Sequence, residues 1–211
     1  AAEMLASVAV QMKVERFFYL SHIGADKSSA YALLKAKALA ETVIRDSGIP
    51  YTILRTAVLY GSGDHFTESF LKYAAFFFGT ALLPGKGESR IQPIWIEDLV
   101  TCLLLCLDDR KTVFQTLQLG GMEVLSIREC VEMILSAAGK KTRIMTISPV
   151  WWRTLLIAME QWFGSFPRMY FWADYLAEDR ITALDVLPRD FGLMPTRMSQ
   201  NLGYLRPAKK T

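Results

Sequence analysis

The sequence is poor in the residues that build metal and disulfide sites. Its 211 residues include two histidines, which lie far apart, and three cysteines, which cannot all pair. Cys102 and Cys106 lie four residues apart in an apolar stretch of helical character, which favours buried free thiols. We therefore expect no metal site, and we expect a reducing compartment, the cytoplasm.

A strong charge bias and a long apolar run are missing too. The 24 lysines and arginines barely exceed the 21 aspartates and glutamates, and the net charge is +3. Nucleic-acid-binding domains usually carry a stronger basic bias, so we expect no nucleic-acid partner. No run of about 18 apolar residues occurs, and charged and amide side chains interrupt the richest stretch, 150–163. We therefore expect no transmembrane segment.

The sequence also lacks the turn G-x-G-x-x-G, which cradles phosphates between a strand and a helix in many nucleotide-binding folds. It does contain other parts of such a fold. Apolar runs at 17–20 and 51–55, typical of buried strands, flank a helical pattern over about 30–46, and together they predict a βαβ unit. Further strands are expected at 91–96 and 114–119, a turn at 83–88, and a helix capped by Asp98. The fold class is α/β, a partial doubly wound, Rossmann-like parallel sheet.

The last third of the chain has a different character. From residue 149 the pattern is mainly helical and aromatic-rich, with an apolar stripe at helical spacing made of Trp152, Leu155, Leu156, Met159 and Phe163. We divide the chain into residues 1–140, part of a Rossmann-like domain, and residues 141–211, a helical substrate or partner lobe. The stripe most simply packs as a small core. An apolar ligand pocket, a peripheral membrane contact and a partner surface are the alternatives.

Four stretches carry a family resemblance. They are residues 16–26 (RFFYLSHIGAD), 37–41 (KALAE), 51–61 (YTILRTAVLYG) and 92–99 (QPIWIEDL). In this order and spacing they resemble the second half of atypical or extended short-chain dehydrogenases/reductases, in the NmrA-like and NAD(P)-dependent epimerase group, which includes complex I accessory subunits. The resemblance implies NADP or NAD as cofactor. It also implies that the family's glycine-rich segment lies before residue 1. Residues 1–140 would then be the carboxyl-terminal part of the NAD(P)-binding domain.

Catalysis in that family rests on a serine, a tyrosine and a lysine, the last two spaced Y-x-x-x-K so that they share one helix face. The lysine ammonium favours the phenolate, which exchanges a proton with a carbonyl or alcohol beside the nicotinamide. Tyr31 and Lys35 fit this spacing literally. The family phrase K-A-x-x-E begins instead at Lys37, and the residue four positions earlier is Leu33.

Helical periodicity favours Lys37 as the inward lysine. At about 100° per residue, the arc of Lys37 also carries Leu33, Ala36, Ala40, Val43 and Ile44, and this apolar arc should face the sheet. Tyr31 and Lys35 fall on the opposite arc, toward water. Ribose hydroxyls of the cofactor would partner a buried Lys37. Two alternatives are that Lys37 only extends to the helix edge and that a late helix start makes Tyr31 and Lys35 the catalytic pair.

The resemblance assigns the remaining site residues. Ser21, at the carboxyl end of the first strand, matches the family serine, although a serine that only turns the chain is an almost equal alternative. The catalytic candidates are Ser21, Lys37 and Tyr31. Cofactor contacts are expected from Ser21, Lys37, Thr56 and Val58. Substrate contacts are expected from Tyr60, His65 and Gln92.

Two functions follow from these residues. The first is an NAD(P)-dependent oxidoreductase or epimerase that acts on a small organic or nucleotide-sugar substrate. The second is a non-catalytic, NmrA-like protein that senses a dinucleotide or serves as an assembly or regulatory subunit. Leu33 at the tyrosine position favours the second function, whereas Ser21 and Lys37 are compatible with cofactor binding in both.

Overall fold

The computed structural model describes residues 2–77, 80–140, 143–162, 172 and 175–206. A three-stranded parallel sheet, in the order β1-β2-β7, contains β1 (Phe17–His22), β2 (Tyr51–Thr56) and β7 (Gln115–Leu119). The helix α2 (Ala32–Asp46) connects β1 to β2, and Phe17 pairs with Tyr51. The predicted βαβ unit is confirmed.

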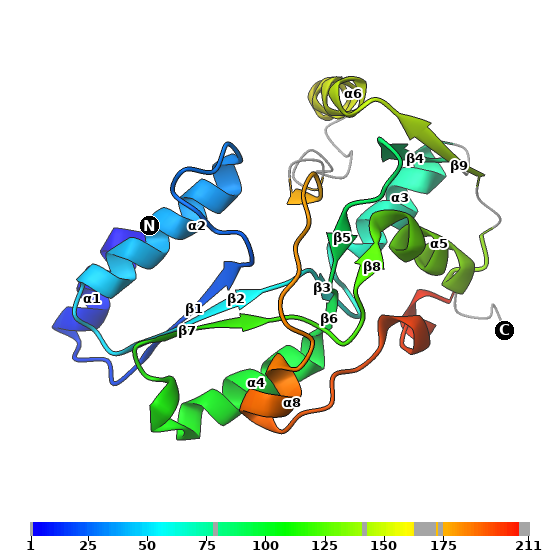
Figure 1. Ribbon diagram of the computed structural model, residues 1–211. Coiled ribbons are helices and arrows are strands. Elements are labelled where there is room, and N and C mark those ends of the chain that lie inside the picture. The colour runs from blue at the N-terminus through cyan, green and yellow to red at the C-terminus, as the bar shows by residue number, and fades with distance from the viewer. Residues whose placement is uncertain (1, 78–79, 141–142, 163–171, 173–174, 207–211) are drawn as a thin grey trace, which may run out of the picture.

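Helices cover both faces of this sheet (Figure 1). On one face lies α2, with α1 (Ala2–Gln11) packed beside it; on the other lie α4 (Ile96–Asp108) and α8 (Val186–Phe191). Beneath α4 a buried apolar core is formed by Leu54, Ile94, Leu99, Cys102, Cys106, Leu119, Val186 and Leu187. Helices on both faces of a parallel sheet define the doubly wound α/β class, so the predicted fold class is confirmed.

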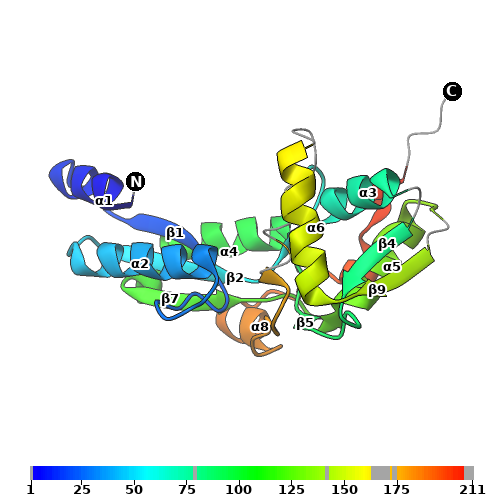
Figure 2. The same ribbon diagram turned by 90° about the horizontal axis from the view of Figure 1, so that it is seen from above.

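A second group of elements lies beside the sheet (Figure 2). Here β4 (Thr80–Pro84) pairs in parallel with β9 (Arg143–Ile147), and α3 (Thr67–Phe76), α5 (Ile127–Ala137) and α6 (Pro149–Trp162) share a buried core with β4. Two short pairs join the groups: β3 (Leu59–Tyr60) with β6 (Ile94–Trp95), and β5 (Arg90–Ile91) with β8 (Leu125–Ser126).

The apolar stripe predicted on α6 packs into the second group. Trp152, Leu156 and Met159 are buried in its core, and Leu155 packs against them. Phe163 lies outside the described residues. The stripe is therefore core, as its simplest interpretation predicts.

Two strand predictions need correction. The sequence predicts a turn over 83–88, but β4 extends to Pro84 because the distant strand β9 completes its hydrogen bonds. It also predicts one strand over 91–96. The structure has β5 and β6 instead, separated at Gln92 and Pro93, since proline has no N–H for a strand ladder.

Asp98 is not the cap of α4, as the sequence predicts. The helix begins at Ile96 and its N-cap is Trp95. The carboxylate of Asp98 accepts hydrogen bonds from the backbone N–H (2.6 Å) and the hydroxyl (3.1 Å) of Thr196. Asp98 therefore fastens the carboxyl-terminal segment to α4.

The division of the chain at residue 140 stays a prediction. Residues after 140 return to both groups of elements, because β9 pairs with β4 and α8 packs on α4. In the described ranges no helix combines the length and the apolar character needed to cross a membrane.

Candidate functional site

A cleft of about 380 Å³ opens beyond the carboxyl ends of β1 and β3. In parallel α/β sheets, ligands bind at this edge, and the volume lies in the usual range for small-molecule sites. We call it the strand-end cleft. Its lining residues are His22, Val58, Leu59, Tyr60, Gly61, Ser62, Gly63, Asp64, His65, Phe66, Ile96, Trp172 and Tyr175.

Three of the predicted site residues meet in the strand-end cleft: Val58, Tyr60 and His65. Val58 is buried, whereas His65 is exposed. The phenol of Tyr60 donates a hydrogen bond to the carbonyl oxygen of Thr196 (3.1 Å), and burial raises the pKa of this phenol, so it stays protonated at neutral pH. Their contact with a substrate or cofactor stays a prediction.

His22, which the sequence analysis did not single out, also lines this cleft. Its ring meets that of Tyr175 edge-on, with 5.3 Å between ring centres. Burial, and then the nearby ammonium of Lys37, lower the pKa of the His22 imidazole to about 4. His22 is therefore neutral at pH 7. Its position directly after Ser21, at the end of a parallel strand, was the available sequence signal.

The depressed pKa of His22 predicts a pH-dependent stability. An unfolded chain binds the proton near pH 6.5 and the folded protein only near pH 4, so the unfolded state binds more protons between these values. The free energy of unfolding should fall by up to about 3 kcal/mol as the pH drops through this window. Urea unfolding at several pH values tests this, with His22→Asn as the variant that loses the effect. A histidine NMR titration in which His22 protonates near pH 6.5 would contradict it.

Lys37 points toward the sheet. Its ammonium donates a hydrogen bond to the carbonyl oxygen of Leu20 (2.7 Å) and lies 4.9 Å from the centre of the Tyr19 ring. Burial lowers the pKa of Lys37, and the charge of Glu41 partly offsets this. Lys35 is exposed. Lys37 is thus turned toward the sheet and Lys35 toward solvent, while the role of Lys37 toward a ligand stays a prediction.

The buried face of α2 differs from the predicted arc. It consists of Leu34, Ala38, Glu41 and Ile44. The reason is Glu41, a fully buried carboxylate that an apolar periodicity cannot include. Tyr31 also differs from its predicted place in solvent, because it is the N-cap of α2 and packs half-buried against the core of the second group.

Ser21 is part of a buried polar cluster. Its hydroxyl donates to Oε1 of Glu41 (2.5 Å), and Nε of Arg55 donates to the same oxygen (2.9 Å). The other carboxylate oxygen, Oε2, accepts from Nη2 of Arg55 (2.7 Å) and from Nη2 of Arg45 (2.8 Å). The hydroxyl of Ser21 is therefore engaged inside the protein. Its catalytic role stays a prediction, and these contacts favour the structural alternative.

Thr56 and Gln92 are likewise buried and hydrogen-bonded within the protein. The hydroxyl of Thr56 donates to the carbonyl oxygen of Ser21 (3.3 Å). The amide of Gln92 donates to the carbonyl oxygen of Gly121 (2.6 Å) and accepts from the N–H of Thr182 (2.8 Å). Neither residue lines the strand-end cleft, and their predicted ligand contacts stay untested.

A metal centre has no obvious place in the described part of the chain. Within it, no group of three or more histidine, cysteine, aspartate or glutamate side chains could hold an ion. The three cysteines are buried free thiols, and burial raises the pKa of each, that of Cys102 to about 12.

A parallel sheet covered on both faces, with a cleft at the carboxyl ends of its strands, defines a doubly wound, Rossmann-like fold. The sequence profile of the NmrA-like family matches residues 2–186, so the chain belongs to the NmrA-like family. The resemblance inferred from the sequence, and with it an NAD(P)-binding, short-chain-dehydrogenase-like fold, is confirmed.

Curated relatives include a subunit named for NADH dehydrogenase from several organisms. The chain is 30% identical over 135 residues (63% of this chain and 33% of the relative) to NADH dehydrogenase (ubiquinone) 1 alpha subcomplex subunit 9, mitochondrial, of Arabidopsis thaliana. It is 23% identical over 201 residues (91% and 51%) to the mouse protein of that name. The chain thus spans between a third and about half of these relatives' length.

Solved structures share the fold. A nucleoside-diphosphate-sugar epimerase of Staphylococcus aureus superposes with a TM-score of 0.75 at 15% identity, covering 96% of this chain and 69% of the epimerase. An NADPH-dependent quinone oxidoreductase of Escherichia coli, solved with NADPH, superposes with a TM-score of 0.74 at 17% identity, covering 97% and 70%. At such identities the similarity establishes the fold.

The predicted cytoplasmic location is wrong. The relatives from Arabidopsis, mouse, Neurospora and Dictyostelium are mitochondrial proteins. The prediction rested on unpaired cysteines, but Cys102, Cys106 and Cys130 are buried in the core. Because these thiols are shielded in the core, their free state does not indicate whether the compartment is reducing.

Proposed function

We propose that this protein is a nicotinamide-dinucleotide-binding subunit of a mitochondrial NADH dehydrogenase, and that it holds NAD or NADP without transferring protons. One juxtaposition carries the proposal: Lys37 is turned toward the sheet near His22, which lines the strand-end cleft, and Leu33 lies four residues before it, where the resemblance places the family's catalytic tyrosine.

The described residues fit the nicotinamide–ribose half of a dinucleotide. The strand-end cleft has largely apolar walls, which suit the nicotinamide ring, and it lies at the strand edge where such folds bind ligands. An ammonium has three N–H donors, and Lys37 gives one to Leu20. The others suit ribose hydroxyls. When bound, a dinucleotide would supply a hydride donor or acceptor.

The described phenols of this cleft do not suit acid–base catalysis. Burial raises the pKa of both Tyr60 and Tyr175, so both are neutral phenols at physiological pH. A catalytic tyrosine needs the opposite shift, toward the phenolate. This supports binding without turnover, and so do relatives that are named as subunits of NADH dehydrogenase.

A pair of lysine variants tests the binding proposal. The affinities for NADPH and for NADH are measured by nicotinamide fluorescence in three proteins: the natural protein, Lys37→Ala and Lys35→Ala. Loss of a charge-assisted hydrogen bond costs about 1.5–3 kcal/mol, so Lys37→Ala should weaken binding at least about tenfold. Lys35→Ala is the matched control, two residues away and exposed, and should change affinity less than about twofold.

Three outcomes would overturn the proposal. If the protein binds neither dinucleotide, the proposed function is wrong. Equal losses for the two lysine variants would show that Lys37 does not face the cofactor. Steady oxidation of NADPH in the presence of a quinone or a nucleotide sugar would show that the protein is an enzyme after all.

A further inference from the structure

The carboxyl-terminal segment, residues 196–206, is hydrogen-bonded to two residues of the strand-end cleft. The phenol of Tyr60 donates to the carbonyl oxygen of Thr196 (3.1 Å), and the phenol of Tyr204 donates to Oδ2 of Asp64 (3.1 Å). Tyr60 and Asp64 line the cleft, whereas none of residues 196–206 is among its described lining residues. The segment therefore fastens the wall of the cleft without forming part of it.

The loop 61–66 forms one wall of the strand-end cleft, and Asp64 ties its two ends together. Every residue of the loop lines the cleft. Oδ2 of Asp64 accepts a hydrogen bond from the N–H of Gly61 (2.7 Å), at the first residue of the loop. Oδ1 accepts from the N–H of Thr67 (2.6 Å), where α3 begins, and from the Thr67 hydroxyl (2.9 Å). The orientation of this one carboxylate thus decides the shape of the loop.

Tyr204 connects the Asp64 carboxylate to a distant part of the chain. The other hydrogen-bond donors described for this carboxylate lie within four residues of Asp64, whereas Tyr204 belongs to the turn Gly203–Leu205. The Tyr204 ring is half-buried, and its centre lies 5.8 Å from that of the Trp95 ring. Burial raises the pKa of the phenol, so the hydroxyl keeps its proton and donates the hydrogen bond. Hydrogen bonds to a charged acceptor are stronger than neutral ones, so this contact orients Asp64.

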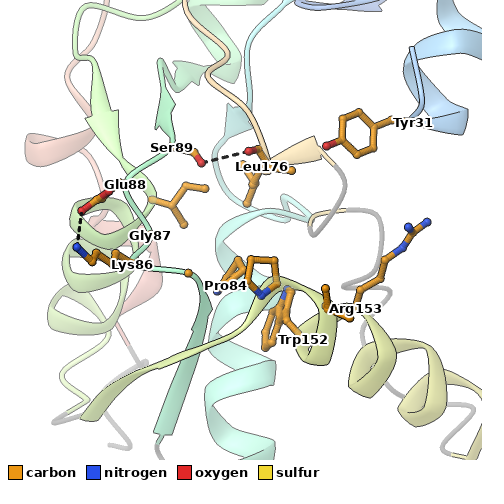
Figure 3. Close-up of a pocket in the computed structure, with 14 residues that line it drawn as sticks. Tyr31, Pro84, Lys86, Gly87, Glu88, Ser89, Trp152, Arg153 and Leu176 are labelled. Carbon is orange, nitrogen blue, oxygen red and sulfur yellow. Dashed lines mark hydrogen bonds and ion pairs between the residues drawn. The ribbon is translucent and has the colours of Figure 1, made fainter. Parts of the chain in front are cut away.

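The segment has no such bonds to a second cleft in the described part of the chain. This second cleft, of about 430 Å³, lies between the start of α2 and the start of α6 (Figure 3). Its walls include Tyr31, Trp152, Arg153 and the turn at 84–89. None of residues 196–206 is among its described lining residues, and none of the hydrogen bonds described for the segment reaches them. The contacts of the segment therefore act on the strand-end cleft.

We propose that Tyr204 is a positioning residue of the strand-end cleft: its phenol orients Asp64 and so holds the loop 61–66 in the shape that receives a dinucleotide. The inference rests on the dinucleotide binding proposed above. Without the phenol hydroxyl, Asp64 keeps its bonds to Gly61 and Thr67 but loses the contact that ties it to the carboxyl-terminal segment. The loop should then open more often, and a dinucleotide must order it at a cost in conformational entropy.

Tyr204→Phe tests the proposal because phenylalanine keeps the ring and removes only the hydroxyl. We expect the affinity for NADPH, measured by nicotinamide fluorescence under conditions in which the protein is fully folded, to fall about five- to tenfold. A lower overall stability alone would not change this affinity. Tyr51→Phe is the matched control, because it makes the same change at the amino end of β2, at the opposite edge of the sheet. It should bind NADPH within about twofold of the natural protein.

A double variant shows whether Tyr204 acts through Asp64. Asparagine is close in size to aspartate, but its N–H₂ group replaces the oxygen that accepts from Tyr204 and Gly61. Asp64→Asn should therefore weaken NADPH binding by itself, and adding Tyr204→Phe should weaken it less than about twofold further. If the two losses add in full, or if Asp64→Asn binds NADPH like the natural protein, the phenol does not act through Asp64 and the inference is wrong.

Amide hydrogen exchange without ligand keeps the inference separate from the proposed function. The N–H of Gly61, which donates to Asp64, should exchange at least about fivefold faster in Tyr204→Phe than in the natural protein or in Tyr51→Phe. If the natural protein binds neither NADPH nor NADH, the proposed function fails, and the exchange rate of Gly61 alone decides whether Tyr204 holds the loop. The inference is wrong if Gly61 exchanges at the same rate with and without the Tyr204 hydroxyl, or if a protein that binds NADPH binds it equally well after Tyr204→Phe.

Discussion

Gly121→Ala is expected to remove most of the protein's stability. A Cβ on Gly121 would stand 1.9 Å from the carbonyl oxygen of Pro93 and 2.9 Å from its carbonyl carbon. Because the obstacle is backbone, no change of side-chain rotamer relieves the clash, and the end of β7 must move away from the β5–β6 connection. We expect the free energy of unfolding to fall by at least about 4 kcal/mol, out of the roughly 5–15 kcal/mol of a typical domain.

The close approach at Gly121 also carries hydrogen bonds that the displacement would break. The N–H of Gly121 donates to the carbonyl oxygen of Gln92 (3.2 Å), and the Gln92 amide donates back to that of Gly121 (2.6 Å). Gly203→Ala is the control, because no described heavy atom lies within 4 Å of the Cβ it would add. Urea unfolding should show Gly203→Ala within about 0.5 kcal/mol of the parent. A loss below 1 kcal/mol for Gly121→Ala would contradict the geometry.

Elements that depend on neighbours in sequence were predictable. The start of α5 is an example, because the pattern S-x-x-E at 126–129 is typical of a capping box. The structure contains it: the hydroxyl of Ser126 accepts from the N–H of Glu129 (3.2 Å), and the Glu129 carboxylate accepts from the N–H of Ser126 (2.7 Å). The βαβ unit of β1, α2 and β2 follows from local apolar patterns in the same way. Such patterns contain both partners of each interaction within a few residues.

Residues whose partners are distant in sequence could not be placed. Gln92 is polar and lies in a family motif, so the sequence predicts a substrate contact, but its amide is bonded to Gly121 and Thr182. Glu41 counts as a solvent residue in any apolar periodicity, yet it is buried because Arg55 reaches it from β2. Neither pairing can be read before the fold is known.

Tyr31 shows why a spacing rule depends on where a helix begins. The i, i+4 relation that would join Tyr31 to Lys35 holds only inside a helix. Here α2 begins at Ala32, and Tyr31 is its N-cap with an extended backbone (φ −90°, ψ 118°). With the helix start at Ala32, Tyr31 packs against the core of the second group while Lys35 is exposed to solvent.

Glu41→Gln is expected to be the second most damaging substitution. Glu41 has no exposed side-chain surface, and its hydrogen bonds from Ser21 of β1 and Arg55 of β2 join α2 to the sheet. It also accepts a hydrogen bond from Arg45 of α2. Glutamine keeps the size but removes the charge, so the half-buried guanidinium of Arg55 loses its carboxylate. Removing one partner of a buried ion pair typically costs about 3–5 kcal/mol, and we expect urea unfolding to show a loss of about 3 kcal/mol.

The free energy of unfolding at acidic pH gives a second test of the role of Glu41. Burial by itself would raise the pKa of Glu41, but hydrogen bonds from Arg55, Ser21 and Arg45 outweigh it and hold this pKa below its ordinary value of 4.5. Because the folded state has the lower pKa, the stabilisation is present above pH 4.5 and is lost as the pH falls through the folded pKa. The difference in unfolding free energy between the parent and Glu41→Gln should therefore narrow below pH 4.5, and the protonation of His22, which both proteins share, cancels in this difference.

Glu68→Gln isolates the effect of burial. Glu68 and Lys72 also form an i, i+4 pair on a helix (3.1 Å), but their side chains are 39% and 66% exposed. Exposed pairs contribute little, so Glu68→Gln should cost less than about 0.5 kcal/mol. Both substitutions remove one carboxylate from a helical pair, and they differ in burial and in the contact with Arg55. Equal costs would mean that the buried cluster does not hold α2 against the sheet, and another contact would then have to hold Lys37 at the carbonyl oxygen of Leu20.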